Sequence, residues 1–216
     1  MTMALQAPLA LRVGVTGHRA DKLREESIAR VSPLIATTLQ RLRDVAQRAQ
    51  AARLQVVSPL AEGADRLVAR LALEQGAELI APLPFPRDQY LEDFSSVPSK
   101  AEFDALLKEA REVITLKGNR ATEQGRKAAY AAVGAAVVDK SDLLLALWNG
   151  EAADGHGGTA EVVQSARRAG RVVLWLPTTA APPQLLLADG VIADQAIDAF
   201  VQHASDILAK RLAGAR

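Results

Sequence analysis

Apolar residues along this chain follow two patterns. Short continuous runs indicate strands buried on both faces, and a spacing of three or four indicates the buried side of an amphipathic helix. The continuous runs predict strands at residues 12–16, 54–58, 78–83, 112–116, 143–148 and 172–176. The second pattern predicts helices at residues 20–51, 64–76, 99–110, 126–138, 159–169 and 192–212. Strands and helices therefore alternate along the chain.

Alternating strands and helices with short connections favour parallel pairing through right-handed crossovers. The predicted fold class is α/β, with a doubly wound, mostly parallel, Rossmann-like sheet in a single domain. Residues 82–98 contain four prolines and predict no regular element before Ser99, which forms a capping-box pattern with Glu102. The predicted organisation is an N-terminal arm at 1–11, the Rossmann-like domain at 12–177, and a linker with a C-terminal helix at 178–216 that packs on the same domain.

The composition agrees with one compact domain. The chain has 216 residues, 49% of them hydrophobic and 4% aromatic, which suits an aliphatic core. A formal net charge of +1 offers no broad attraction for nucleic acid or anionic lipid, so neither is an expected partner. The sequence has no cysteine, no apolar run of membrane-spanning length and no signal-like start. We therefore expect a cytoplasmic protein without membrane association.

Four predicted strands run directly into small or glycine-rich residues, at 13–19, 56–66, 79–86, and 144–150 followed by 155–161. Because parallel strands end at one edge of a sheet, these loops can surround a single ligand. In the first loop, Gly17 lets backbone amides approach an anion and Arg19 can grip a phosphate in a bidentate way. The alternative is a tight turn with Arg19 in solvent. The predicted ligand residues of this loop are Thr16, Gly17, His18 and Arg19.

The second loop carries Glu62, Gly63 and Asp65 just where the next helix opens. On one interpretation Gly63 admits the ligand, and Glu62 or Asp65 accepts hydrogen bonds from ribose hydroxyls or from a base edge. On the other, the acidic residues only offset the dipole of the helix. Both interpretations remain open at this point.

The glycines before the helix at 159–169 give the strongest local signal. They free the backbone to place its N–H groups around a phosphate at the positive end of the helix dipole. The predicted ligand residues here are Gly157, Gly158 and Thr159. Glu161 either stabilises the first helical turn or reaches into the site to bind a sugar hydroxyl or to assist water.

Two further side chains are candidates. Trp148 either stacks on a base or packs at the edge of the core. Arg126 shares a helix face with Tyr130, four residues later, so both can point to the ligand edge. The three histidines lie far apart with no carboxylate at metal-ligand spacing, so we expect neither a metal nor a cofactor.

Together these motifs resemble the Smf/Lonely-Guy (SLOG) superfamily of Rossmann-like nucleotide-binding domains, over roughly residues 12–177. Residues 13–19 and 58–65 are similar to the first two ligand loops of the DNA-processing Smf branch. Arg126-Lys127, Asp142 before a strand, and residues 157–161 resemble the Lonely-Guy phosphoribohydrolases, which release a base from a nucleoside monophosphate. The hydrolase motif has its acid three residues after the threonine. That position holds Val162 here, and Glu161 comes one residue earlier.

The resemblance implies three functions, in this order. The first is binding of a nucleotide or nucleotide-derived metabolite, with phosphate held by the glycine-rich loops. The second is hydrolysis of an N-glycosidic bond, with Glu161 and Arg126 as the catalytic residues. The third is binding of single-stranded DNA, for which the net charge offers little. The resemblance also implies a homo-oligomer.

Overall fold

A computed structural model describes residues 9–50, 52–151 and 158–214. Its strands are β1 (Ala10–Gly17), β2 (Arg53–Val57), β3 (Glu78–Leu83), β4 (Glu112–Thr115), β5 (Leu143–Trp148), β6 (Val172–Pro177), β7 (Gln184–Leu187) and β8 (Gly190–Ile192). Its α-helices are α1 (Glu25–Arg48), α2 (Ala64–Glu74), α3 (Arg87–Tyr90), α4 (Val97–Glu109), α5 (Glu123–Lys140), α6 (Thr159–Arg168) and α7 (Ala196–Gly214), with short 3-10 turns η1 (Ala20–Lys22) and η2 (Leu91–Asp93). Within these ranges, no helix combines the length and the apolar content needed to cross a membrane.

The strands form one sheet in the order β4-β3-β2-β1-β5-β6-β7-β8. Strands β1 to β6 pair in parallel, and β7 and β8 add an antiparallel end. The predicted α/β class, with a doubly wound and mostly parallel sheet in a single domain, is confirmed. From β1 the chain builds β2, β3 and β4 on one side and then returns to place β5 and β6 on the other. The strand order therefore reverses between β1 and β5.

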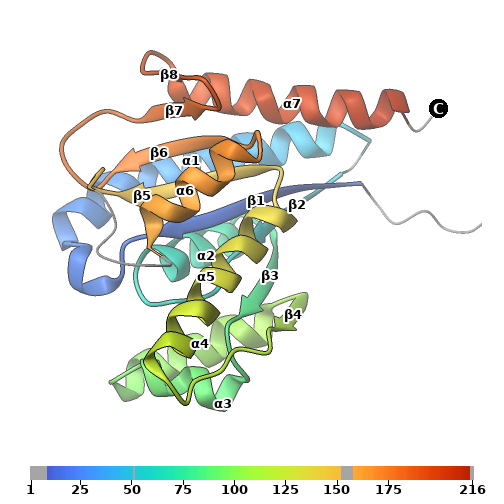
Figure 1. Ribbon diagram of the computed structural model, residues 1–216. Coiled ribbons are helices and arrows are strands. Elements are labelled where there is room, and N and C mark those ends of the chain that lie inside the picture. Colours follow the sequence, from blue (N-terminus) through green and yellow to red (C-terminus); the bar gives the residue numbers. More distant parts are fainter. Residues whose placement is uncertain (1–8, 51, 152–157, 215–216) are drawn as a thin grey trace, which may run out of the picture.

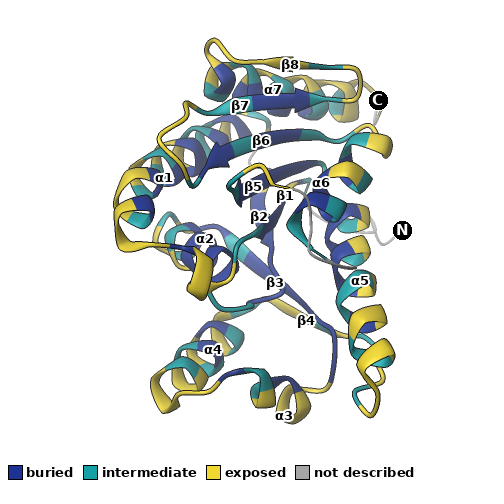
Figure 2. Ribbon diagram, turned by 60° about the vertical axis from the view of Figure 1, so that its left-hand side comes forward, coloured by how far each residue is buried: buried dark blue, intermediate teal, exposed yellow. Residues whose placement is uncertain are grey.

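Helices cover both faces of the sheet. In Figure 1, α5 and α6 lie on the near face, whereas α1 and α2 lie on the far face with α7 beside α1. Figure 2 shows the same layers from the edge where the parallel strands end, with α2 on one side and α5 and α6 on the other. In both views the strands lie between the helices, and Figure 2 shows the central strands as buried. Because β1 to β6 are parallel, the loops that follow them leave the sheet at the same edge.

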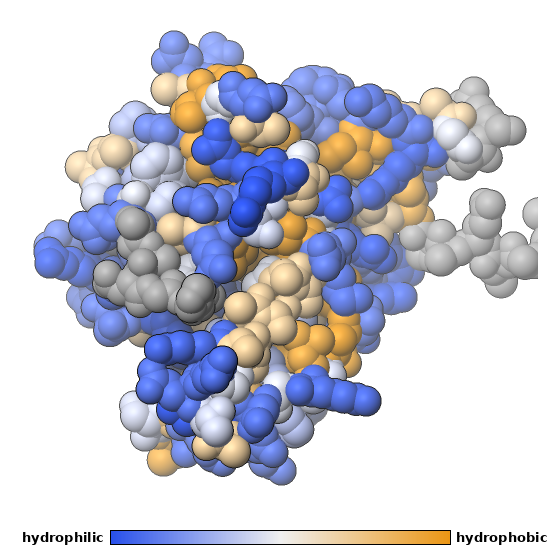
Figure 3. Space-filling model, in the orientation of Figure 1, coloured by the Kyte–Doolittle hydropathy of each residue, from blue (hydrophilic) through white to orange (hydrophobic). Residues whose placement is uncertain are grey.

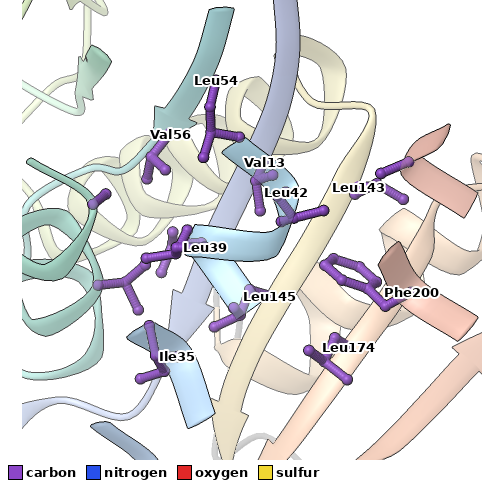
Figure 4. Packing of buried hydrophobic residues seen from close by; sticks show 14 of the residues in the cluster. Val13, Ile35, Leu39, Leu42, Leu54, Val56, Leu143, Leu145, Leu174 and Phe200 are labelled. Atoms are coloured by element: carbon purple, nitrogen blue, oxygen red, sulfur yellow. The ribbon is translucent and has the colours of Figure 1, made fainter. Parts of the chain in front are cut away.

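The core explains why the central strands are apolar without interruption. On β5, Leu143, Leu145 and Leu147 belong to the cluster formed with α1 and α7, whereas Leu144 and Ala146 belong to the cluster formed with α5 and α6. Figure 4 shows the first cluster, in which side chains from α1 and α7 meet those of the strands. Because successive side chains of a strand point to opposite faces, a strand covered on both faces needs apolar residues at every position.

The predicted helix over residues 20–51 is wrong at its start. The structure has the 3-10 turn η1, then Leu23 and Arg24 in extended conformation, and begins α1 only at Glu25. Leu23 is buried in the core there. The break also leaves Asp21 and Lys22 beside the cavity described below.

The capping box predicted at Ser99 is also wrong. α4 begins at Val97, and the Ser96 side chain caps it by accepting a hydrogen bond from the Ser99 N–H at 3.2 Å. The Ser99 hydroxyl instead donates to Glu62 and accepts from Arg66. Ser99 is thus used in a tertiary contact with α2 and its preceding loop, which local sequence spacing does not reveal. The proline-rich stretch before it contains α3 and η2, both missed from sequence.

The C-terminal segment differs from prediction as well. Residues 184–192, expected as linker and helix start, form the β7–β8 hairpin, and α7 begins at Ala196. Leu185 is buried under α7 and Leu186 on the α5–α6 side, so pairing with β6 lets both side chains be covered at once. α7 packs against α1 and β6. The division of the chain at residues 12 and 177 stays a prediction.

Candidate ligand-binding site

A cavity of about 410 Å³ opens where the strand order reverses, at the carboxyl ends of β1 and β5. Its walls come from the β1–η1 turn, the β2–α2 loop, the residues after β5, the start of α6 and the inner side of α5. In open parallel sheets, such a crevice is where ligands bind. The geometric expectation that the glycine turns meet around one space holds for His18, Asp65 and Thr159, which all border this cavity.

Two glycines interlock the first two loops. A Cβ on Gly17 would lie 2.5 Å from the Ala64 Cβ and 2.6 Å from the Leu147 carbonyl oxygen, so only glycine fits. Gly63 has φ +96°, and a Cβ there would lie 2.5 Å from the carbonyl oxygen of His18. The Ala64 N–H donates to that same oxygen at 3.0 Å. Gly63 therefore joins the two loops and does not border the cavity.

His18 ties the β1 turn to the end of β5. Its backbone N–H donates to the Leu147 carbonyl at 2.8 Å, and its ring Nε2 accepts from the Asn149 N–H at 3.1 Å. Burial lowers the pKa of His18, with Lys22 acting in the same direction. A ring nitrogen that accepts a hydrogen bond must carry a lone pair, so this geometry holds the imidazole neutral. The ring therefore positions the loop and adds no fixed charge.

Asp65 is the acidic residue of the second loop that borders the cavity. The residue is only 7% exposed, and its Oδ2 accepts from the Ala61 N–H at 3.3 Å. Burial raises its pKa from the ordinary 3.8 to about 7, against the opposing effect of Arg19, the Ala61 N–H and Arg66. A buried carboxyl that titrates near neutrality in a cleft is a candidate for a functional role.

Arg19 lies at the same end of the cavity as two tyrosines. Its guanidinium carbon is 5.6 Å from the centre of the Tyr130 ring, a cation–π distance. The Tyr130 hydroxyl donates to Asp93, whose other oxygen accepts from Arg120 at 2.6 Å. This chain of contacts orients the Tyr130 ring against the cavity and gives Arg19 a defined place beside it.

Gly158 and Thr159 border the cavity at the first turn of α6. Val162 borders it too, whereas Glu161 does not. One residue along a helix turns a side chain by about 100°, which accounts for the difference between these neighbours. Gly157, the remaining predicted residue of this loop, lies outside the described residues.

Trp148 borders the cavity as part of an aromatic pair. Its ring centre lies 5.1 Å from that of Trp175, with the planes 37° apart. Each indole N–H is bound: Trp148 donates to the Glu151 carbonyl at 2.7 Å, and Trp175 donates to the Trp148 carbonyl at 2.9 Å. The pair is therefore held in one orientation at the end of β5.

Besides Gly63 and Glu161, two further predicted residues, Glu62 and Arg126, lie away from the cavity. Glu62 accepts from the Ser99 hydroxyl and faces α4. Arg126 donates to the Arg120 carbonyl at 3.4 Å, although Tyr130 on the same helix face does border the cavity. Asp142, part of the hydrolase-like pattern, lies at the opposite edge of the sheet, where it pairs with Arg211.

Sequence reasoning missed several residues of the cavity wall. Asn149 and Glu151 directly follow β5, so the rule that ligands bind beyond strand ends could have included them. Tyr90 comes from α3, inside the proline-rich stretch predicted to be irregular. As an aromatic residue it could stack on a base or pack in the core, and the sequence favoured packing. Among the described residues, no group of three potential metal ligands occurs.

The strand order and the helices on both faces define the class of this protein as a Rossmann-like domain. Its cavity lies at the switch point, which is the place between β1 and β5 where the strand order reverses. Among solved structures, the chain is similar to DNA processing protein A (DprA) from Streptococcus pneumoniae, with a TM-score of 0.55 and 19% identity over 93% of this chain and 61% of DprA. It is also similar to TM1055, with a TM-score of 0.44 and 14% identity over 76% of this chain and 72% of that one. A third is the molybdenum cofactor carrier protein from Chlamydomonas reinhardtii, with a TM-score of 0.42 and 18% identity over 77% and 76%.

These likenesses concern the fold. The likeness to DprA shows a shared Rossmann-like fold, which is the fold that the resemblance to the Smf branch implies. The chain spans 61% of the length of DprA. No family model and no curated protein sequence matches it.

Proposed function

We propose that this protein binds a nucleotide or a nucleotide-derived metabolite in the cavity at the carboxyl edge of its sheet. The observation that carries the proposal is the convergence of the β1 turn, the β2–α2 loop and the start of α6 on one space at the switch point. Its volume of about 410 Å³ lies within the range of small-molecule sites, roughly 300–1,000 Å³.

The phosphate of this ligand lies between the β1 turn and α6. The first turn of a helix has N–H groups without intrahelical partners and the positive end of the helix dipole. Gly158 and Thr159 supply that turn here, and Arg19 and Lys22 border the same cavity with positive charge. The arrangement supports binding of an anionic group in a protein whose net charge is only +1.

The sugar and base occupy the rest of the cavity. Val133, Gly134 and Val137 of α5 give it an apolar wall, and Trp148 offers an aromatic surface to a base. Asp65 offers a carboxylate to ribose hydroxyls or to a base edge. A cavity with an apolar wall and a few polar groups suits a ligand that has both an aromatic and a polar part.

The test uses the two tryptophans of the chain, which are in contact with each other and one of which borders the cavity. A nucleotide that binds should change their fluorescence and raise the melting temperature by mass action. Arg19→Gln should weaken binding, and Arg30→Gln, an exposed residue outside the cavity, serves as the matched control. If no nucleotide in a broad panel changes either signal, the proposal is wrong.

A second candidate is hydrolysis of the N-glycosidic bond of a nucleoside monophosphate. The observation that favours it is Asp65, because a buried carboxyl with a pKa raised to about 7 can exchange a proton near neutral pH. A chromatographic assay for free base tests it, comparing Asp65→Asn with Glu161→Gln. Loss of turnover only in Asp65→Asn would assign the proton transfer to Asp65, and absence of free base from any monophosphate would exclude the reaction.

We also propose that the protein forms a homo-oligomer, as the resemblance implies. The exposed side of α5 carries Ala128, Ala132 and Ala135, and Figure 3 shows a weakly hydrophobic band across the middle of this face of the molecule. Small side chains of this kind let two helices approach closely. Light scattering measures the mass directly, and a monomer at high concentration would contradict the proposal.

A further inference from the structure

Tyr90 is the most deeply buried aromatic residue that borders the cavity. The residue is 1% exposed, and its ring packs against Phe94 and Phe103, with ring centres 5.1 and 5.6 Å away. Its hydroxyl makes no hydrogen bond to any of the residues that the structure describes. Hydroxyls of buried tyrosines usually have a partner. Among the described residues this hydroxyl is not one of the fully buried side-chain atoms that lack a partner, so it opens onto the cavity, and its partner is to be sought there.

Tyr130 provides the contrast. It borders the same cavity, but its hydroxyl donates to Asp93, which Arg120 holds in place. The two tyrosines thus differ in one respect that matters here. The hydroxyl of Tyr130 is used by the fold, whereas that of Tyr90 is left for another molecule.

Asp65, which borders the same cavity, has one carboxyl oxygen that can still accept a hydrogen bond. Its Oδ2 accepts the Ala61 N–H, and within the described residues its Oδ1 accepts no hydrogen bond. Asp65, Arg19 and Tyr90 all border the cavity. Burial has the largest effect on the pKa of Tyr90, and the charges of Arg19, Asp65 and Asp93 act on it as well. The pKa of Tyr90 is raised, which keeps the hydroxyl protonated and able to donate.

We infer that Tyr90 is a specificity-determining residue, whose hydroxyl acts with the Asp65 carboxyl as a buried pair that binds an adjacent donor and acceptor on the ligand. This inference rests on the proposed nucleotide function. The carboxylate accepts from a ligand O–H or N–H, and Tyr90 donates to a neighbouring oxygen. A site with buried polar groups selects strongly against ligands that leave them unpaired.

Two parts of a nucleotide carry such an adjacent donor and acceptor. One is the 2′,3′-diol of ribose. The other is the lactam edge of hypoxanthine or guanine, where a ring N–H stands beside a carbonyl. Adenine carries the two groups in the reverse order, an N6 amino donor beside the N1 acceptor, so a fixed pair of protein groups that fits hypoxanthine does not fit it in the same orientation. A 2′-deoxynucleotide has no vicinal diol. Comparing inosine, adenosine and 2′-deoxy monophosphates therefore separates the two sources.

The test compares Tyr90→Phe with Tyr130→Phe. Tyr90→Phe removes a hydroxyl that the apo protein does not use, so its urea midpoint should not fall. Tyr130→Phe removes the hydrogen bond to Asp93 and should lower the midpoint. Tyr90→Phe should also weaken nucleotide binding about 5- to 10-fold, as expected for one neutral hydrogen bond.

The preference of the protein for one nucleotide over another gives a sharper test than the affinity for a single nucleotide. The wild-type protein should prefer either inosine to adenosine monophosphate, or ribo to 2′-deoxy forms, and Tyr90→Phe should lose most of that preference. If wild type binds nucleotides and Tyr90→Phe binds them all with unchanged affinity and preference, the inference is wrong while the proposed function stands. If wild type binds no nucleotide at all, the proposed function fails and the inference fails with it.

Discussion

Asp65 gives the protein a stability that depends on pH in a predictable direction. In the folded protein its pKa is raised, mainly by burial, from 3.8 to about 7. Between these two values the folded state holds a proton that the unfolded state has lost, so the free energy of unfolding falls as pH rises. The stabilising effect is complete below pH 3.8 and is lost once pH passes about 7. Asp65→Asn removes this titration and keeps the size of the side chain and an oxygen for the Ala61 N–H.

The size of the effect follows from the two values. One pKa unit corresponds to about 1.4 kcal/mol, so the difference between 3.8 and about 7 amounts to roughly 4 kcal/mol. Because the wild-type carboxyl is ionised above neutral pH in an environment that opposes its charge, Asp65→Asn should be the more stable protein there. We expect a gain of roughly 3–5 kcal/mol at pH 8.5 that declines toward zero near pH 4. Residues that are kept for function often lower the stability of the fold in this way.

Urea unfolding at a series of pH values measures the difference directly. Taking wild type minus variant cancels the titration of every other group that the substitution leaves unchanged. Asp189→Asn, an exposed residue in the β7–β8 turn, is the matched control and should show no such trend. Parallel stability curves for wild type and Asp65→Asn across this range would refute the reasoning about burial at this site.

Three other outcomes are expected. Gly17→Ala should destabilise the fold by roughly 1–3 kcal/mol or more in urea, because its Cβ would lie 2.5 Å from Ala64, whereas Gly190→Ala has nothing within 4 Å and should be neutral. Arg66→Met removes a 2% exposed guanidinium and leaves the Leu60 and Ser99 carbonyls without its N–H donors, so it should lower the free energy of unfolding by roughly 1–3 kcal/mol. Arg70→Met removes the exposed partner of Glu102, which Arg66 also contacts, and should lower it by less than about 1 kcal/mol, and equal losses would contradict the burial argument. A gel-shift titration with single-stranded DNA at moderate salt should show no complex, given the net charge of +1, and tight binding would overturn that expectation.

Arg66 shows what local patterns cannot reveal. Its Nε donates to the Leu60 carbonyl at 2.9 Å, another guanidinium N–H reaches Ser99, and the group lies 4.2 Å from the centre of the Phe94 ring. This contact draws Ser99 away from the helix cap that the sequence predicts for it. It also places Glu62 against α4, so that only Asp65 of the two acidic candidates faces the cavity. From their spacing in the sequence, Glu62 and Asp65 are equally good candidates for the ligand site. The tertiary contact with Ser99 turns Glu62 toward α4 and leaves Asp65 at the cavity.

The sequence by itself determined the six parallel strands and the edge at which a ligand would bind. Continuous apolar runs, alternating with helices, allow only a sheet covered on both faces, and the glycine loops then follow the strands to one edge. Gly17, His18, Asp65 and Thr159, predicted in this way, border the cavity. The tertiary structure decided which side chains turn inward, because that depends on packing between distant segments. Tyr90 borders the cavity because α3 packs its ring on Phe94 and Phe103, and Glu161 does not because one step along α6 turns it away.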